Sequence, residues 1–214
     1  MKLAITNNAK ILAIFAVACT ALVALVNLLT KDRIAEQQQK YLLTTLHQVI
    51  SEERLNNDLY QDCQLVTNEE LLGSAEPQKL YIARQDNIPV AIAVTAVAPG
   101  GYNGKINLLI AINSDETISG VRVLKHNETP GLGDKIETRK DDWILSFNGK
   151  STTGETDLRW QVKKDGGNFD QFTGATITPR AVVKAVHKSM LYYQQNKQSI
   201  LESAVPCRGD DENL

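Results

Sequence analysis

Two short segments of the chain combine glycines with hydroxyl or carboxyl side chains and could therefore carry chemistry. The first reads Glu-Thr-Pro-Gly-Leu-Gly-Asp-Lys (residues 128–135), and the second reads Asp-Gln-Phe-Thr-Gly-Ala-Thr-Ile-Thr (residues 170–178). In the second segment Gly174 lets the backbone turn or approach a ligand closely, and Thr176 presents a hydroxyl two residues before an expected helix start. Because a helix N-terminus attracts anions through its free N–H groups and its dipole, a phosphate near Thr176 would be favoured.

Both segments also have an ordinary structural explanation, which is favoured when each is taken alone. Thr178 is then the N-cap of a helix, Pro179 is its first residue, and the small residues before them form a tight turn. Gly131 and Gly133 then supply the positive φ angles of a loop that ends a strand. No GxGxxG motif follows a strand, so the sequence does not indicate a Rossmann-type dinucleotide site.

The bulk composition argues against several other functions. The chain has 23 basic and 25 acidic side chains, a formal net charge of -2, and so lacks the basic surplus that nucleic-acid binding requires. Its three cysteines, Cys19, Cys63 and Cys207, form no CxxC motif and have no paired histidines nearby. The usual ligand spacing of a zinc or iron–sulfur site is therefore missing, and redox chemistry would need an organic cofactor.

The elements that would position the two segments begin with an apolar stretch. Residues 11–29 read ILAIFAVACTALVALVNLL and carry no charge, and at about 1.5 Å per residue they span close to 30 Å, one bilayer core. A cleaved signal peptide is the main alternative, but its apolar region would be shorter, and here Lys31, Asp32 and Arg33 follow directly. Basic residues lie on both sides of the stretch, so the positive-inside rule does not decide the orientation.

The rest of the chain predicts an α+β domain, an antiparallel sheet with flanking helices. Residues 55–80 are polar and irregular, and a helix is expected to begin at Thr178 and Pro179. Between them, runs rich in Val, Ile and Ala are separated by turn residues, which predicts an antiparallel meander. The expected strands cover residues 81–84, 90–97, 105–113 and 118–125.

These patterns predict a division of the chain into five parts. We expect a cytoplasmic N-terminus, a transmembrane helix, a helical stalk with a roughly helical apolar spacing, a folded domain and a disordered acidic tail. The corresponding ranges are residues 1–10, 11–30, 31–55, 56–207 and 208–214.

The second segment resembles the flavinylation motif of FMN-binding domains that are modified by ApbE-type flavin transferases. The match covers Asp170, Thr173, Gly174, Ala175 and Thr176, with Thr173 where many members have serine. In that family the threonine that matches Thr176 carries FMN through a phosphoester, and the aspartate that matches Asp170 belongs to the recognised motif.

The first segment resembles the one that helps form the flavin pocket in the same family. The resemblance therefore implies covalently bound FMN as the cofactor, with Thr176 as the attachment point rather than a catalytic base. The other implied cofactor-binding residues are Asp170, Thr173, Gly174, Ala175, Thr178, Glu128, Thr129, Pro130, Gly131, Leu132 and Gly133. No catalytic residue and no metal ligand is predicted.

Over essentially its whole length the chain resembles the G subunits of the Rnf (Rsx) electron-transport complexes. The resemblance implies a redox subunit, not catalytic alone, of a complex that couples electron transfer between NADH and ferredoxin to ion translocation. It further implies a single-pass protein of the bacterial inner membrane with its main domain in the periplasm. The implied partners are the other membrane subunits and, during maturation, the flavin transferase.

Two alternatives remain beside this interpretation. The C subunit of the sodium-pumping NADH:quinone reductase has the same motif but is usually longer. A non-redox anchored binding module would leave Thr176 unmodified. In an oxidising periplasm, Cys63 and Cys207 are also expected to form a disulfide, although sequence spacing cannot distinguish this from two free thiols.

Overall fold

The computed structural model describes the backbone of residues 2–202 and the side chains of residues 5–200. It divides the chain into two compact units, Met1–Leu42 and Leu43–Leu214. Helix α1 (Lys2–Val49) forms the first unit and reaches the first residues of the second.

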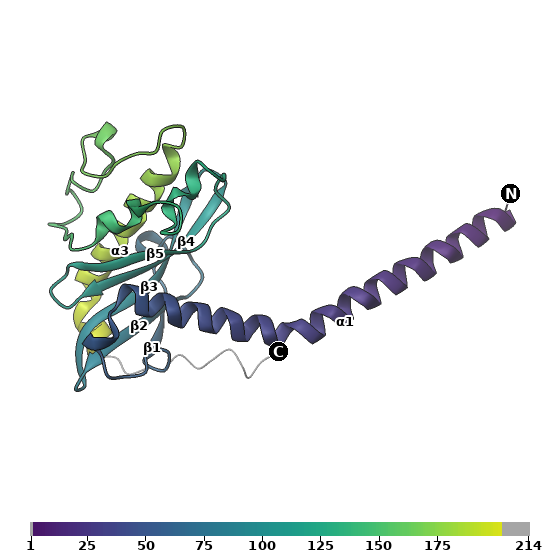
Figure 1. Ribbon diagram of the computed structural model, residues 1–214, viewed down its shortest axis with the longest axis horizontal. Coiled ribbons are helices and arrows are strands. Elements are labelled where there is room, and N and C mark those ends of the chain that lie inside the picture. The colour runs from purple at the N-terminus through teal and green to yellow at the C-terminus, as the bar shows by residue number, and fades with distance from the viewer. Residues whose placement is uncertain (1, 203–214) are drawn as a thin grey trace. The chain divides into compact units, whose positions relative to one another are not determined.

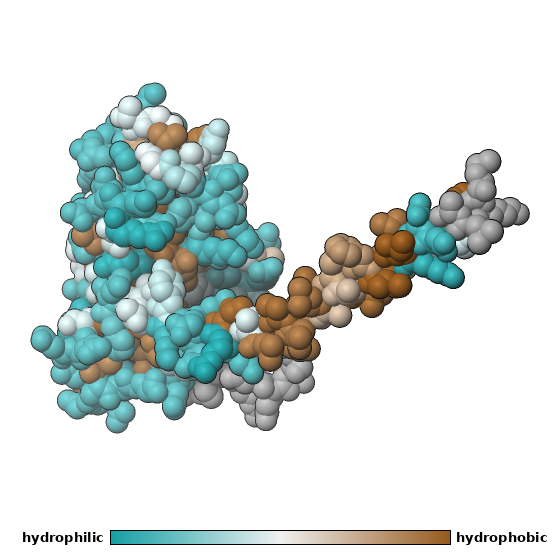
Figure 2. Space-filling model, turned by 45° about the vertical axis from the view of Figure 1, so that its right-hand side comes forward, coloured by the Kyte–Doolittle hydropathy of each residue, from teal (hydrophilic) through white to brown (hydrophobic). Residues whose placement is uncertain are grey.

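The apolar part of α1 has the properties of a single membrane span. Apolar side chains line most of the helix (Figure 2), and they are exposed on every side, Phe15 for example by 70%. The hydroxyls of Thr20 and Thr30 donate to the carbonyls of Ala16 and Val26 at 2.8 Å. These polar groups are thus satisfied within the helix, as a lipid environment requires. A helix this long and apolar on all faces fits a bilayer.

The second unit contains a five-stranded antiparallel sheet in the order β1-β2-β3-β4-β5 (Figure 1). The meander predicted from the sequence is therefore confirmed. Its strands are β1 (Cys63–Val66), β2 (Gln78–Gln85), β3 (Ile88–Gly101), β4 (Gly104–Asn113) and β5 (Ile118–Lys125). Asp86 and Asn87 join β2 to β3 with φ angles of 53° and 65°, the left-handed conformation that short hairpin turns need.

Strand β1 corrects the expectation that residues 55–80 are irregular. It has only four residues, too few for a visible alternation, and it pairs with β2 from Cys63↔Tyr81 to Val66↔Gln78. A short helix, α2 (Glu69–Leu72), follows, with Asn68 accepting the N–H of Leu71 at its start. Cys63 is buried and disulfide-bonded, and its predicted partner, Cys207, lies outside the described residues.

One face of the sheet forms the main core with helix α3 (Ile177–Glu202), which packs on β3 and β4. The sheet contributes mainly branched aliphatic residues at alternate positions, and α3 contributes Val182, Val183, Val186 and Met190. Two short 3₁₀ helices extend this core: η2 (Gly133–Ile136) contributes Ile136, and η3 (Asp142–Phe147) contributes Trp143, Ile144 and Phe147. Burial of this apolar face fixes the position of α3 and hence of its first turn.

The opposite face of the sheet carries small residues, which allow a close approach. Ala83, Ala91, Ala93 and Ala111 are buried there. At β5, a Cβ built on Gly120 would lie 3.1 Å from the Cα of Val49, and the Ser119 hydroxyl donates to the Val49 carbonyl at 2.6 Å. The end of α1 therefore packs directly on the backbone of β5.

This close approach predicts that Gly120→Ala destabilises the fold by about 1–3 kcal/mol, because the added methyl must displace the Val49 backbone. Urea unfolding of the full chain in detergent measures the loss. The matched control is Gly100→Ala, where an added Cβ meets nothing within 4 Å; its effect should stay within about 0.5 kcal/mol. Equal effects of the two substitutions would contradict this packing.

Candidate functional site

The structure brings the two segments from the sequence analysis together around one pocket of about 300 Å³, here called the Thr176 pocket. Three parts of the chain form its walls: the β3–β4 turn, the segment after β5, and the start of α3. The lining residues are Tyr102, Glu128, Thr129, Leu132, Gly133, Gly174, Ala175, Thr176, Ile177 and Thr178. Segments that are about 40 residues apart in sequence thus meet where the flavin resemblance predicted.

The tip of the loop in the first segment lies outside the lining of the pocket. The N–H groups of Leu132 and Gly133 both donate to the Thr129 carbonyl at 3.1 Å. This turn leaves Pro130 and Gly131 exposed and outside the lining. Gly131 has the expected positive φ of 78°.

Gly133 differs from the expectation, because its φ is not positive. The constraint at this position is space. A Cβ on Gly133 would lie 2.8 Å from Glu128 Oε2 and 2.9 Å from Thr178 Oγ1. The glycine is needed for close packing instead of for a turn.

The loop of the second segment is anchored by an aromatic residue and carries polar groups at its surface. Phe172 is buried against Trp143, with ring centroids 5.0 Å apart, and the indole N–H of Trp143 donates to the Asp170 carbonyl at 2.8 Å. The Asp170 carboxylate is exposed and pairs with Lys163 at 2.6 Å. Asp170 and Thr173 therefore lie on the loop surface and do not line the pocket.

Thr176 lies at the point where this loop enters α3. Gly174 turns the backbone with a φ of 82°, and the helix begins at Ile177, immediately after Thr176. This corrects the expectation that the helix begins at Pro179, which is in fact its third residue. The first N–H groups of a helix lack intrahelical acceptors, so Thr176, a partly buried residue, lies next to a favourable anion position.

Thr178 is also not an N-cap, because its side chain bonds elsewhere. It is fully buried in the first turn of α3, and its hydroxyl donates to Glu128 Oε2. Glu128 is only 5% exposed, and its Oε1 accepts the backbone N–H of Asn103 at 3.1 Å. One carboxylate therefore connects the β3–β4 turn, the segment after β5 and α3.

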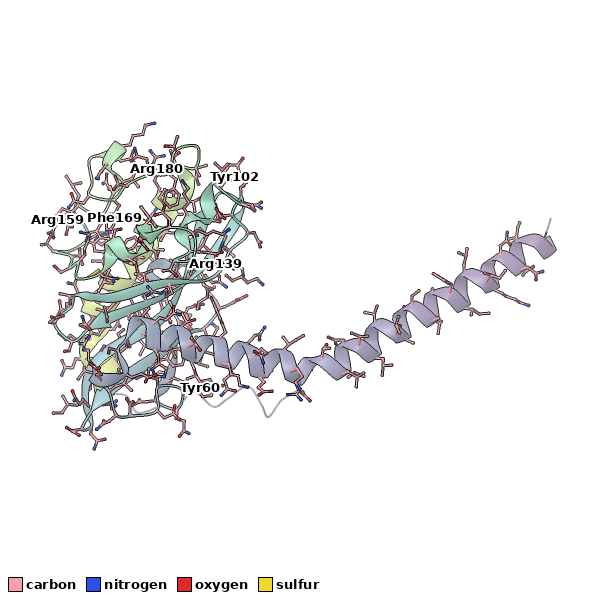
Figure 3. All side chains as sticks on the ribbon, in the orientation of Figure 1. Tyr60, Tyr102, Arg139, Arg159, Phe169 and Arg180 are labelled. Carbon is pink, nitrogen blue, oxygen red and sulfur yellow. The ribbon has the colours of Figure 1, made fainter. Side chains whose placement is uncertain are left out.

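An exposed apolar rim surrounds the pocket. It consists of Tyr102, Leu132 and Ile177, which are 68%, 41% and 46% exposed. Tyr102 projects from the β3–β4 turn (Figure 3). The other large apolar side chains exposed between residues 43 and 200 are Leu65, Ile88 and Leu158, so half of this class lies at one site.

Sequence reasoning did not predict Tyr102 or Ile177 as site residues. A signal for Ile177 was present, since an apolar residue directly after the expected attachment point stands beside any bound group. Tyr102 stands next to Gly101, and an aromatic residue in a glycine-rich turn is a comparable signal.

Two groups of ion pairs form in the segments that flank the pocket residues in sequence. Arg180, in the first turn of α3, binds both carboxylate oxygens of Asp165 at 2.6 and 2.8 Å and lowers the pKa of that carboxyl. Arg139 and His126 both contact Glu137, and the hydrogen bond from Arg139 is the main cause of its lowered pKa. The Arg180 pair is well exposed and therefore orients more than it stabilises.

The residues of the pocket fit an FMN group. The apolar rim matches the faces of a flat isoalloxazine ring, and the pocket volume is at the lower end of the range for small-molecule sites. A hydroxyl at a helix start suits a phosphoester.

Comparisons with known proteins agree with this geometry. A family model described as FMN-binding domain matches residues 101–190, and one described as RnfG N-terminal region matches residues 1–49. A relative in Shewanella loihica is 54% identical over 97% of this chain and 98% of its own length. Relatives in Vibrio atlanticus and Vibrio cholerae are 52% and 51% identical, each over at least 97% of both chains.

These matches define a membrane-anchored protein with an FMN-binding domain. All three relatives are named as the G subunit of an ion-translocating oxidoreductase complex. The chain belongs to this G-subunit family, which confirms the resemblance over the whole length. The match of residues 1–49 to the G-type N-terminal region favours this family over the C-subunit alternative.

The buried Thr178–Glu128 bond predicts that Thr178→Val destabilises the protein by about 1–3 kcal/mol. The valine nearly preserves the shape but leaves the buried Glu128 oxygen without its donor. Urea unfolding compares it with Thr178→Ser, which keeps the hydroxyl and should lose less stability. A serine variant as unstable as the valine variant would mean that the bond contributes nothing.

Proposed function

We propose that the chain is a flavoprotein subunit that carries FMN esterified to Thr176 and passes electrons within an ion-translocating oxidoreductase complex. The observation that carries the proposal is the convergence of both motif segments on one pocket, with the Thr176 hydroxyl at its edge. The FMN-binding domain and membership of the G-subunit family support the cofactor and the complex.

The geometry favours attachment through the phosphate. Thr176 immediately precedes α3, where the helix N-terminus contributes about 0.3–1 kcal/mol to binding a nearby anion at an exposed site. Gly174 and Ala175 keep the approach to the hydroxyl unobstructed by large side chains. An ester at this position keeps the cofactor bound outside the cytoplasm, where a lost flavin would not be replaced.

The pocket residues then have distinct roles. Leu132, Ile177 and Tyr102 offer apolar contacts to the ring, and Glu128 and Thr178 hold the pocket walls together. The bound FMN supplies the electron-accepting and electron-donating chemistry, while the protein supplies position and electrostatics. In this proposal the protein acts as an electron carrier within the complex and does not catalyse a reaction alone.

The partners follow from the two surfaces of the protein. Membership of the G-subunit family implies the other subunits of the complex as partners, and the apolar α1 would put the chain in the same membrane. The exposed Asp170 and Thr173 leave their part of the flavinylation motif accessible in the folded protein, as a flavin transferase would need.

The attachment site is tested by removing one oxygen. Thr176→Val keeps the side-chain shape, so we expect a folded protein that has lost all covalent flavin after co-expression with a flavin transferase. Flavin fluorescence in a denaturing gel and mass spectrometry of the peptide around residue 176 measure it. Thr153→Val, at an exposed threonine outside the pocket, should keep the flavin.

Two results would contradict this assignment. Covalent flavin in Thr176→Val would place the bond on another residue. A colourless wild-type protein in the presence of an active transferase would support the non-redox binding module instead.

We also propose that the chain resides in the inner membrane, with residues 1–10 in the cytoplasm and the FMN-binding domain in the periplasm. A single membrane span in α1 would put the residues before it and the domain after it on opposite sides of the membrane. An alkaline phosphatase fusion after Leu214 should therefore be active, and a β-galactosidase fusion at the same point should be silent. The opposite pattern would place the domain in the cytoplasm.

A further inference from the structure

Glu128 is a buried carboxylate that forms no ion pair with any side chain that the structure describes. Its side chain lies in the wall of the Thr176 pocket and is 5% exposed. It accepts hydrogen bonds from the Asn103 backbone N–H and the Thr178 hydroxyl. Since acceptor bonds on both oxygens suit a carboxylate, a negative charge is held at this wall by neutral donors alone.

Close packing prevents this carboxylate from turning out to solvent. A Cβ on Gly101 would lie 2.9 Å from Oε1, and one on Gly133 would lie 2.8 Å from Oε2. The two glycines therefore enclose the carboxylate from the hairpin side and from the loop side. Its position relative to the pocket is fixed by three segments of backbone.

A fixed, buried charge of this kind acts strongly on its surroundings. The effective dielectric constant inside a protein is lower than in water, so a charge there is felt across the width of a small pocket. Reduction of a bound flavin adds two electrons from the reductant and one or two protons from solvent, and negative charge near the ring opposes it.

We propose that Glu128 lowers the reduction potential of the FMN carried by this protein. The inference rests on the proposed function, because it requires FMN in the Thr176 pocket. Glu128 then has two roles: its charge lowers the reduction potential of the flavin, and its hydrogen bonds join the pocket walls. The carboxylate makes the reduced protein a stronger electron donor.

Two substitutions separate charge from packing. Glu128→Gln removes the charge but keeps the shape, since the amide oxygen can accept from Asn103 and the amide nitrogen can donate to Thr178 Oγ1. Glu128→Asp keeps the charge but shortens the side chain, which weakens both hydrogen bonds. An exposed carboxylate, Glu155, supplies the control Glu155→Gln with the same change in net charge.

The reduction potential of the bound flavin is measured on the full chain in detergent, by dithionite titration against reference dyes. The signal is normalised to the amount of flavin attached to each variant. For Glu128→Gln we expect the ratio of reduced to oxidised flavin at a fixed solution potential to rise about tenfold. For a two-electron couple this is about 30 mV. Glu128→Asp and Glu155→Gln should remain close to the wild type.

Urea unfolding of the same variants without flavin, in the Thr176→Val chain, provides the second readout. There Glu128→Asp should lose more stability than Glu128→Gln. The reduction potential should show the opposite order, with the larger change in Glu128→Gln. An unchanged potential in Glu128→Gln, or equal rises in both Glu128 variants, would overturn the inference while leaving flavin attachment intact. Absence of covalent flavin from the wild type would instead overturn the proposed function on which the inference rests.

Discussion

The geometry of the site depends on the hydrogen bond between the Thr178 hydroxyl and the Glu128 carboxylate. Both groups are buried, so neither can exchange this bond for one with water. The bond connects the first turn of α3 to a segment 50 residues earlier in the chain. Through Asn103, the same carboxylate reaches the β3–β4 turn. Without it, the three walls of the pocket would share no buried polar contact among the described residues.

The sheet and α3 make this arrangement possible. The branched residues of β3 and β4 pack against the valines of α3, so the helix axis and its first turn are fixed by apolar burial. Ile177 is placed at the pocket edge because α3 begins directly after Thr176. Packing in the core thus brings the Thr176 hydroxyl, the apolar rim and the N-terminus of α3 to the same place.

The sequence predicted the sheet from alternation of apolar residues, and the structure confirms β2 to β5. It did not predict β1, because four residues cannot display a period. The two motif segments were recognised, but their meeting at one pocket depends on pairing across the whole sheet. Gly133 was expected to serve a turn, whereas it serves the Glu128–Thr178 contact, a constraint that only the three-dimensional packing reveals. The rim residues Tyr102 and Ile177 had sequence signals beside the glycine-rich turn and the attachment point, but only the structure shows that they line the same pocket.

The order of maturation follows from the loop that Phe172 anchors. Asp170 and Thr173 stay on the surface of the finished fold, while the pocket exists only after strands, turn and α3 have assembled. If FMN is attached as proposed, the modifying enzyme can recognise Asp170 and Thr173 on the surface of the folded chain. A misfolded chain would offer the same linear motif but no pocket for the ring, so a flavin attached to it would stay exposed to water.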